Sequence, residues 1–219
     1  MNKQGNTYTF LYSVILVVVV AALLSIVSLS LQPRQDENRQ NEKRQNILSA
    51  IHIASTAETS AELFNKYIKE QFILNAKGEK IEGKAFDIDI AKEYKKAANE
   101  RELPVFVASV NDTTKYILPI YGAGLWGPIW GYISLDENKT TVYGTFFDHS
   151  GETPGLGAEI TTPKFNEPFK GKEIFSGEQL TSIRIIKGGN ASGSNEVDAI
   201  SGGTITSQGV EAMLKNYLT

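Results

Sequence analysis

The sequence contains no cysteine and only two histidines among its 219 residues. Without cysteine the chain can form no disulfide, thiolate zinc site or iron–sulfur cluster, and it carries no thiol for a lipid anchor. His52 and His149 are too few for a histidine metal cage. We therefore predict no metal site and expect a solvated surface role for each histidine. Any redox chemistry must then come from a bound organic cofactor.

The chain also lacks an excess of charge of either sign, because 22 Lys and Arg residues stand against 25 Asp and Glu residues, a net charge of −3. Nothing in this balance indicates a nucleic-acid partner. The one Gly-x-Gly-x-x-Gly spacing, at residues 122–127, leads into a strand rather than a helix, so it is not the fingerprint of a dinucleotide site and we expect the chain to have no nicotinamide site of its own. The length leaves room for one membrane anchor and one ordinary domain.

Phe10 to Leu31 is free of charge. This run of about 22 residues is long enough to cross a hydrocarbon core of roughly 30 Å as a helix. It exceeds the apolar core of a signal peptide and no clear small-x-small cleavage site follows, which favours a transmembrane helix over a cleaved signal. Lys3 alone precedes it, whereas four basic residues follow: Arg34, Arg39, Lys43 and Arg44. The positive-inside rule would place the large domain in the cytoplasm.

The segment after the anchor is polar and predicts a stalk or solvated helix over residues 32–58. Thr59-Ser60-Ala61-Glu62 reads as a capping box that opens an amphipathic helix through Ile68. A turn around Gly78 follows. Residues 86–90 alternate briefly, and residues 91–102 predict a short exposed helix.

From Pro104 onward the pattern is typical of strands. Strands are predicted over residues 105–110, 116–120, 129–135, 141–147 and 183–187, with turns at 111–112 and 136–139. We therefore predict an α+β fold with a twisted, mainly antiparallel sheet and flanking helices. The expected organisation is a short flank (1–9), a transmembrane helix (10–31), a polar stalk (32–58) and one domain (59–219).

The carboxyl-terminal stretch predicts a loop that feeds a helix. One helical stripe is apolar and consists of Val210, Met213, Leu214, Tyr217 and Leu218. We expect the helix to begin near Ser207, with Thr206 or Ser207 as its N-cap. Gly202 and Gly203 allow close approach of a ligand, and Thr204 adds a hydroxyl, so this corner suits a phosphate group. An ordinary polar turn before a helix is the alternative.

Residues 198–206 read Asp-Ala-Ile-Ser-Gly-Gly-Thr-Ile-Thr. This stretch resembles the flavinylation motif of FMN-binding domains, Asp-x-x-Ser/Thr-Gly-Ala-Thr, in which the last Thr is esterified to the FMN phosphate. The resemblance implies covalent FMN on Thr204, with Asp198 and Ser201 recognised by an FMN transferase. Gly203 stands where the motif usually has Ala. The other motif residues counted with the cofactor site are Gly202, Ile205 and Thr206.

Two further loops combine glycine with apolar or polar side chains. The first, residues 122–132, reads alone as a buried turn with aromatic core residues, and the second, residues 149–157, as a plain connection. Their Gly-Leu-Trp-x-x-x-x-Gly-Tyr and Glu-Thr-Pro-Gly-Leu-Gly motifs are, however, similar to the C subunit of the sodium-translocating NADH:quinone reductase. The G subunit of the Rnf complex shares the second motif and the flavin motif.

This resemblance implies which side chains meet the cofactor. Trp126 and Leu156 are the candidates for contact with the flavin ring, with Gly157 allowing close approach. Glu152 and Thr153 are candidates for hydrogen bonds to the ribityl chain or the phosphate side. No catalytic residue is predicted, because the flavin itself supplies the electron chemistry.

The resemblance thus implies a membrane-anchored covalent flavoprotein that carries electrons through FMN within a Na⁺-pumping NADH:quinone oxidoreductase. The implied partners are the other subunits of that complex, an FMN transferase and the lipid of the bacterial inner membrane. The family places the domain in the periplasm, against the positive-inside count. Two alternatives stay open: a protein like the G subunit of an Rnf complex, and a non-redox membrane-tethered interaction module.

Overall fold

The computed structural model describes residues 5–218. Lys3, part of the predicted flank 1–9, and Thr219, the predicted end of the domain, lie outside the described residues. The chain divides into two compact units between Lys43 and Arg44. The second unit therefore includes residues 44–58 of the predicted stalk together with the predicted domain (59–219).

The first unit is helical. Helix α1 (Asn6–Ser49) contains the apolar run, whose mean hydropathy reaches 3.0, and in the described residues it is the one helix long and apolar enough to cross a membrane. Within this run the Ser25 hydroxyl donates to the Ala21 carbonyl and the Ser30 hydroxyl to the Val27 carbonyl, both at 2.8 Å. The helix thus satisfies these polar groups internally, as a hydrocarbon environment requires.

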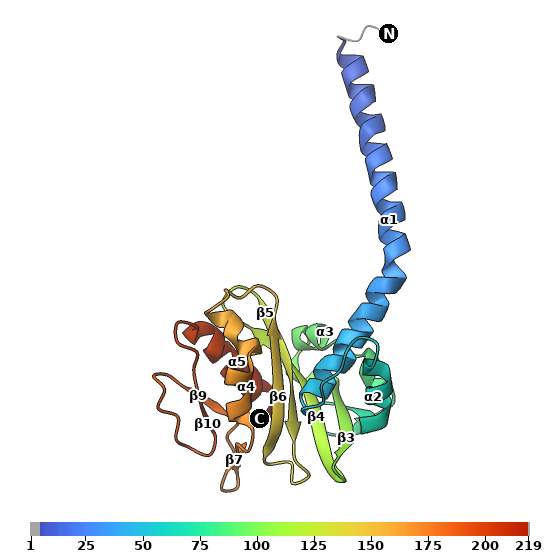
Figure 1. Ribbon diagram of the computed structural model, residues 1–219. Coiled ribbons are helices and arrows are strands. Elements are labelled where there is room, and N and C mark those ends of the chain that lie inside the picture. The colour runs from blue at the N-terminus through green and yellow to red at the C-terminus, as the bar shows by residue number, and fades with distance from the viewer. Residues whose placement is uncertain (1–4, 219) are drawn as a thin grey trace. The chain divides into compact units, whose positions relative to one another are not determined.

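The second unit is built on a six-stranded sheet in the order β2-β1-β3-β4-β5-β6, with every neighbouring pair antiparallel. Its strands are β1 (Ile68–Leu74), β2 (Lys80–Ile81), β3 (Leu103–Val110), β4 (Thr113–Ala123), β5 (Pro128–Leu135) and β6 (Val142–His149). Together with the flanking helices this confirms the predicted α+β fold class (Figure 1). Strand β1 was not predicted, because its solvent-facing residues are mostly charged or polar.

The sheet is covered on both faces, and the alternation of side chains along each strand decides which residues go where. On β5, Tyr132 belongs to a cluster with Ile47, Ile51 and Phe106, whereas Ile133 belongs to a cluster with the apolar side of α5 (Thr204–Leu218). The end of α1 therefore packs on one face and α5 on the other (Figure 1).

Hydrogen bonds reinforce the contact between the end of α1 and the sheet. The buried Ser134 hydroxyl on β5 donates to the Ala50 carbonyl at 2.6 Å. A Cβ at Gly144 on β6 would come within 2.6 Å of the same carbonyl oxygen. Glycine is therefore required for this close approach.

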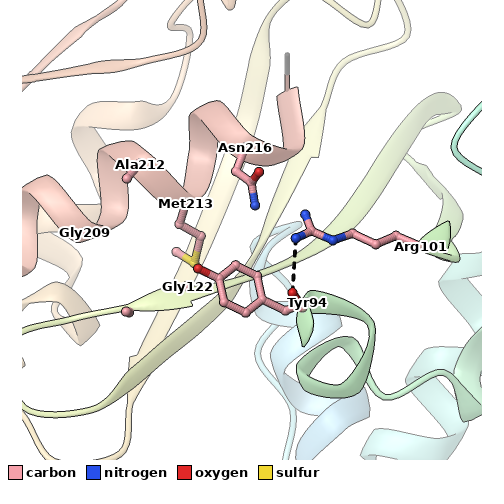
Figure 2. A pocket seen from close by; sticks show the side chains of 8 residues that line it. Tyr94, Arg101, Gly122, Gly209, Ala212, Met213 and Asn216 are labelled. Atoms are coloured by element: carbon pink, nitrogen blue, oxygen red, sulfur yellow. Dashed lines mark hydrogen bonds between the residues drawn. The ribbon is translucent and has the colours of Figure 1, made fainter. Parts of the chain in front are cut away.

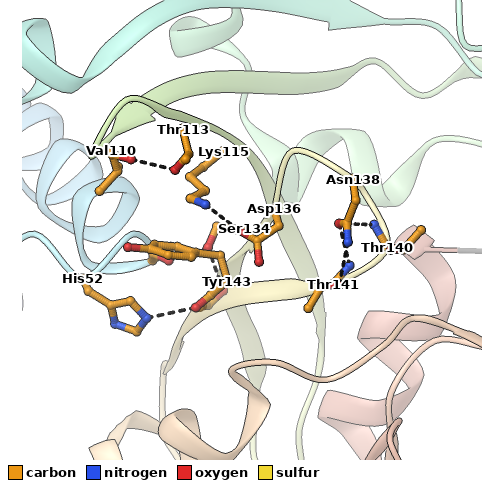
Figure 3. A network of polar contacts seen from close by, with 12 residues as sticks. His52, Val110, Thr113, Lys115, Ser134, Asp136, Asn138, Thr140, Thr141 and Tyr143 are labelled. Atoms are coloured by element: carbon orange, nitrogen blue, oxygen red, sulfur yellow. Dashed lines mark hydrogen bonds and ion pairs between the residues drawn. The ribbon is translucent and has the colours of Figure 1, made fainter.

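The turns between the central strands form as their residue types predict. Asn111 and Asp112 both adopt positive φ, 50° and 58°, as a two-residue hairpin turn requires. In the β5–β6 turn the Asn138 side-chain oxygen accepts from the backbone N–H groups of Thr140 and Thr141 at 3.0 and 3.1 Å. Beside this turn, buried Lys115 forms an ion pair with Asp136 (Figure 3).

Shorter elements complete the unit. The helices are α2 (Ser60–Tyr67), α3 (Ile90–Lys95) and α4 (Pro163–Asn166), and the 3-10 turns are η1 (Ala85–Asp87), η2 (Ala98–Glu100), η3 (Gly157–Thr161) and η4 (Glu167–Phe169). The small strands are β7 (Phe175–Ser176), β8 (Gln179–Leu180), β9 (Arg184–Ile186) and β10 (Glu196–Asp198), of which β9 confirms the strand predicted over residues 183–187. Strand β10 pairs with β9 in parallel and leads the chain into the loop before α5.

Two local predictions are wrong. The Thr59 hydroxyl does not cap α2, because it accepts from the Thr56 backbone N–H at 2.9 Å instead. The helix predicted over residues 91–102 ends at Lys95.

Candidate functional site

One cavity of about 240 Å³ gathers every predicted cofactor residue except Asp198 and Ser201. Its lining comes from the β4–β5 turn, the loop after β6, and the loop that enters α5. The lining residues are Leu125, Trp126, Glu152, Thr153, Leu156, Gly157, Gly202, Gly203, Thr204, Ile205 and Thr206. Segments separated by up to about 80 positions in sequence thus meet around one hollow, to which each of the three motifs contributes.

Thr204 is the first residue of α5, three residues before the predicted start. The predicted N-caps have other partners. The Thr206 hydroxyl donates to Glu152, and the Ser207 hydroxyl accepts from the Ile200 backbone N–H at 3.0 Å and donates to the Gly203 carbonyl at 2.9 Å. The first α-helical bond runs from the Ser207 N–H to the Gly203 carbonyl, so the N–H groups at the start of α5 precede the helical ladder.

Glycine at positions 202 and 203 shapes this corner. Gly202 has a φ of 76°, a backbone conformation that residues other than glycine rarely adopt. A Cβ there would also stand 2.6 Å from Leu156 Cδ2. Leu156 therefore lies directly against the turn that presents Thr204. Within residues 5–218 the Thr204 hydroxyl makes no hydrogen bond, which leaves it available for chemistry.

The walls of the cavity are apolar and open to solvent. Leu125, Trp126, Leu156 and Ile205 are 48%, 69%, 43% and 55% exposed. In the described chain they are all of the exposed large hydrophobic side chains outside residues 10–31. Apolar groups concentrated in this way mark a binding surface. They also exclude the buried-turn alternative for Trp126, although most of residues 122–132 belong to β4 and β5.

Leu125 was not predicted as a site residue. Its position in the sequence could have indicated a site residue. A tight Gly-Ala-Gly-Leu-Trp-Gly turn that carries two large apolar side chains cannot bury both of them. The Gly124 N–H donates to the Gly127 carbonyl at 2.8 Å, so only two residues, Leu125 and Trp126, separate the paired ends of this turn.

Glu152 lines the cavity and is only 5% exposed. Its Oε1 accepts from the Trp126 backbone N–H at 2.9 Å, and its Oε2 accepts from the Thr206 hydroxyl at 2.5 Å. Both carboxylate oxygens are therefore engaged with the protein. Thr153, in contrast, is exposed at the rim.

His149 supports the same loop. Its ring is half-buried, and its Nδ1 accepts from the Glu152 backbone N–H at 3.1 Å, so the predicted solvated surface role is wrong for this residue. His52 is exposed, and its Nε2 lies 3.0 Å from the Tyr143 carbonyl (Figure 3). Among residues 5–218 no group of three or more potential metal ligands is clustered.

Asp198 and Ser201 line a neighbouring cavity of about 460 Å³, together with Glu159, Lys164 and Phe165 among others. Asp198 Oδ1 accepts from the Ala191 N–H at 2.8 Å, while Ser201 is exposed. These two motif residues thus border a different hollow from the one beside Thr204.

A third cavity, of about 380 Å³, lies beside α5, and none of its lining residues was predicted as a site residue. Its lining includes Gly122 on β4, Gly209 on α5 and Arg101 (Figure 2). The Arg101 guanidinium donates to the Tyr94 and Lys96 carbonyls at 3.1 and 3.3 Å. Arg101 therefore holds the backbone at the end of α3, before η2, in place.

Several known proteins are similar to this chain in sequence. Residues 124–219 match the family model of the FMN-binding domain. The C subunit of the Na(+)-translocating NADH-quinone reductase of Haemophilus ducreyi is 31% identical over 99% of this chain and 91% of its own length. The corresponding C subunit from Yersinia pestis is 33% identical over 99% of this chain and 90% of its own length.

The chain belongs to the family of C subunits of Na(+)-translocating NADH-quinone reductases. The family resemblance inferred from the three motifs is thereby confirmed. A crystal structure of the C subunit from Parabacteroides distasonis superimposes with a TM-score of 0.80 at 49% identity, covering 85% of this chain and 92% of that one. The Shewanella oneidensis NqrC structure gives a TM-score of 0.71 at 25% identity, covering 82% of this chain and 92% of that one.

Proposed function

We propose that this chain bears FMN covalently on Thr204 and serves as the membrane-anchored, electron-carrying C subunit of a Na⁺-translocating NADH:quinone reductase. Membership of the C-subunit family and the FMN-binding domain support an FMN-carrying role in that complex. The observation that carries the attachment point is the Thr204 hydroxyl, which has no hydrogen bond within residues 5–218 and lines the apolar cavity at the start of α5.

The residues present suit the parts of FMN. The start of α5 offers backbone N–H groups and the positive end of the helix dipole to a phosphate group. The exposed faces of Trp126, Leu156, Leu125 and Ile205 suit a flat apolar ring system. Bound flavin would supply the redox chemistry, while the protein holds it in place and keeps one side of it from water.

The attachment requires a second protein. An FMN transferase would catalyse attack of the Thr204 Oγ on the FMN phosphorus of a flavin dinucleotide. A phosphoester bond would form, the pyrophosphate bond would break, the nucleoside monophosphate would leave and the hydroxyl proton would be lost. Asp198 and Ser201 border a separate hollow from the one that Thr204 lines. A transferase could therefore engage these two side chains while Thr204 faces the flavin cavity.

Mass spectrometry tests the attachment. Co-production with a flavin transferase should raise the intact mass by one FMN less one water, about 438 Da, and Thr204→Ala should abolish the gain. Thr153→Ala is a matched control, since it removes an exposed threonine hydroxyl at the same rim. An unmodified wild-type chain, with the transferase active on another substrate, would return the protein to a non-redox interaction module.

We also propose that residues 10–31 span the inner membrane in contact with lipid and that the domain faces the periplasm. The family supports this orientation and the positive-inside count opposes it. The absence of cysteine makes a direct test simple. Ser192→Cys, on an exposed loop of the domain, should react with a membrane-impermeant maleimide in intact spheroplasts, whereas Thr7→Cys should react only after lysis. The reverse pattern would place the domain in the cytoplasm.

A further inference from the structure

One buried polar group of the cavity, Glu152, is a carboxylate without a cationic partner in the described residues. Glu152 is 5% exposed and forms no ion pair within residues 5–218. Its two oxygens accept from two different walls, the Trp126 backbone N–H at 2.9 Å and the Thr206 hydroxyl at 2.5 Å. A buried carboxylate costs free energy unless such donors satisfy it, so its position needs a reason.

Glycines on both sides make space for this carboxylate. A Cβ at Gly124 would overlap Glu152 Oε1, and a Cβ at Gly157 would overlap both Glu152 Oε2 and Thr206 Oγ1. Neither glycine has a positive φ, so their backbone conformations would accept other residues. What these positions demand is room for the Glu152 side chain.

We infer that Glu152 is a positioning residue that fixes the separation of the two walls of the flavin site, rather than a flavin ligand. We call the set of Glu152, the Trp126 N–H and the Thr206 hydroxyl the Glu152 bridge. Thr206 lies two residues after Thr204 on α5, and Trp126 lies on the opposite turn. The bridge therefore sets the distance between the attachment hydroxyl and the exposed indole before any flavin arrives. This inference rests on the proposed function, because it assigns the two walls to a flavin.

The bridge also explains a feature of the sequence motif. In Glu-Thr-Pro-Gly-Leu-Gly, the first and last residues act together, since Gly157 leaves the space in which Glu152 meets Thr206. Leu156, between them, is left to face the cavity. The His149 ring holds the start of the motif by accepting from the Glu152 N–H at 3.1 Å.

Hydrogen–deuterium exchange on the unmodified full-length protein in detergent micelles tests the bridge without flavin. Thr206→Val is nearly isosteric but removes the hydroxyl. We expect it to speed exchange of the Trp126 amide by about tenfold, because the free energy of a hydrogen bond to a charged group corresponds to a change in local opening of about that size. Thr206→Ser keeps the hydroxyl and should restore exchange to within about twofold of wild type. The amides of β3 should not change, which separates a local effect from global destabilisation.

Gly157→Ala should disrupt the Glu152 bridge by steric overlap. Gly151→Ala is a matched control in the same loop. Gly151 also lacks a positive φ, and nothing lies within 4 Å of a Cβ placed on it. Gly157→Ala should therefore speed Trp126 exchange as Thr206→Val does, whereas Gly151→Ala should not. If Thr206→Val and Gly157→Ala both leave Trp126 exchange within about twofold of wild type, the bridge does not hold this wall.

The flavin-loaded protein supplies a second readout. Thr206→Val should lower the fluorescence anisotropy of the attached flavin and shift its midpoint potential, and Thr206→Ser should restore both. Failure of the proposed function has a different signature, since Thr204 would then stay unmodified while the exchange of Trp126 still responds to Thr206→Val. Unchanged anisotropy and potential in a fully loaded Thr206→Val protein would overturn the positioning role.

Discussion

A Cβ placed on Gly203 would stand 2.9 Å from Ile200 Cγ2 and 3.1 Å from the Leu156 backbone carbon. The flavinylation motif of FMN-binding domains usually has Ala at this position. This chain instead packs Ile200 into the space that the alanine methyl would occupy. Gly203→Ala should therefore lower the free energy of unfolding by about 1 kcal/mol through mild overpacking. The loss should be no larger, because the backbone conformation of Gly203 accepts alanine.

Thermal unfolding of Gly203→Ala beside Gly202→Ala checks this prediction. Gly202 has a φ of 76° and a Cβ there would meet Leu156 Cδ2 at 2.6 Å, so its substitution should cost clearly more. Flavin attachment should survive Gly203→Ala. Equal melting temperatures for Gly203→Ala and wild type would show that Ile200 yields without cost.

Ser207 holds the motif loop onto α5. Its fully buried hydroxyl accepts from the Ile200 N–H and donates to the Gly203 carbonyl. Ser207→Ala would leave the Ile200 N–H without its partner, and we expect a loss of about 1–3 kcal/mol in the free energy of unfolding. Denaturant unfolding measures this loss, and Ser201→Ala, which removes an exposed hydroxyl, should change stability by less than about 0.5 kcal/mol. Similar losses for both variants would contradict the role assigned to Ser207.

Much of the central sheet could be predicted because its strands are apolar on both faces and separated by residues suited to turns. The hairpin at Asn111 and Asp112 and the strands on both sides of residues 136–139 form as expected. Strand β1 escaped prediction because Lys69, Glu70 and Gln71 are three consecutive exposed polar residues that break the apolar alternation of a strand, so pairing with β3 rather than pattern decides its conformation.

The site residues could be collected from motifs, but their individual roles could not. The family resemblance makes Glu152 a candidate ligand of the flavin, whereas the fold buries it and both of its oxygens accept hydrogen bonds from Trp126 and Thr206. Likewise Thr206 reads as an N-cap, yet α5 begins two residues earlier and its hydroxyl serves the bridge. Such roles depend on contacts between segments that are distant in sequence, which local patterns do not encode.

Trp126 provides a test of ring contact that leaves the fold intact. Because its side chain is 69% exposed, Trp126→Ala should change the free energy of unfolding by less than about 0.5 kcal/mol. The fluorescence and midpoint potential of the attached flavin should nevertheless change, since one stacking face is lost. Trp130→Phe is the control, as Trp130 lies on β5 and is not among the cavity residues. A flavin that is insensitive to Trp126→Ala would show that its ring lies elsewhere.

Tyr217 predicts a pH dependence of stability that is independent of flavin. Burial is the main cause that raises the pKa of this phenol to about 12, and its buried hydroxyl has no partner of good hydrogen-bond geometry, only a weak approach to the Tyr121 backbone. The pKa is raised relative to the unfolded value of about 10, so the folded state holds this proton more tightly. The resulting stability is fully present below pH about 10 and is lost as the pH rises toward 12.

Tyr217→Phe cannot ionise and should therefore lose less stability between pH 9 and 12 than wild type, by about 1 kcal/mol once the partial exposure of the ring is allowed for. At pH 7 the variant should be at least as stable as wild type, because it removes a buried hydroxyl without a good partner. Melting curves across this pH range measure both effects, with Tyr67→Phe as a control for loss of a half-buried tyrosine. Parallel pH profiles for wild type and Tyr217→Phe would mean that the Tyr217 hydroxyl reaches water in the folded protein, since only a hydroxyl kept from water would hold its proton beyond pH 10.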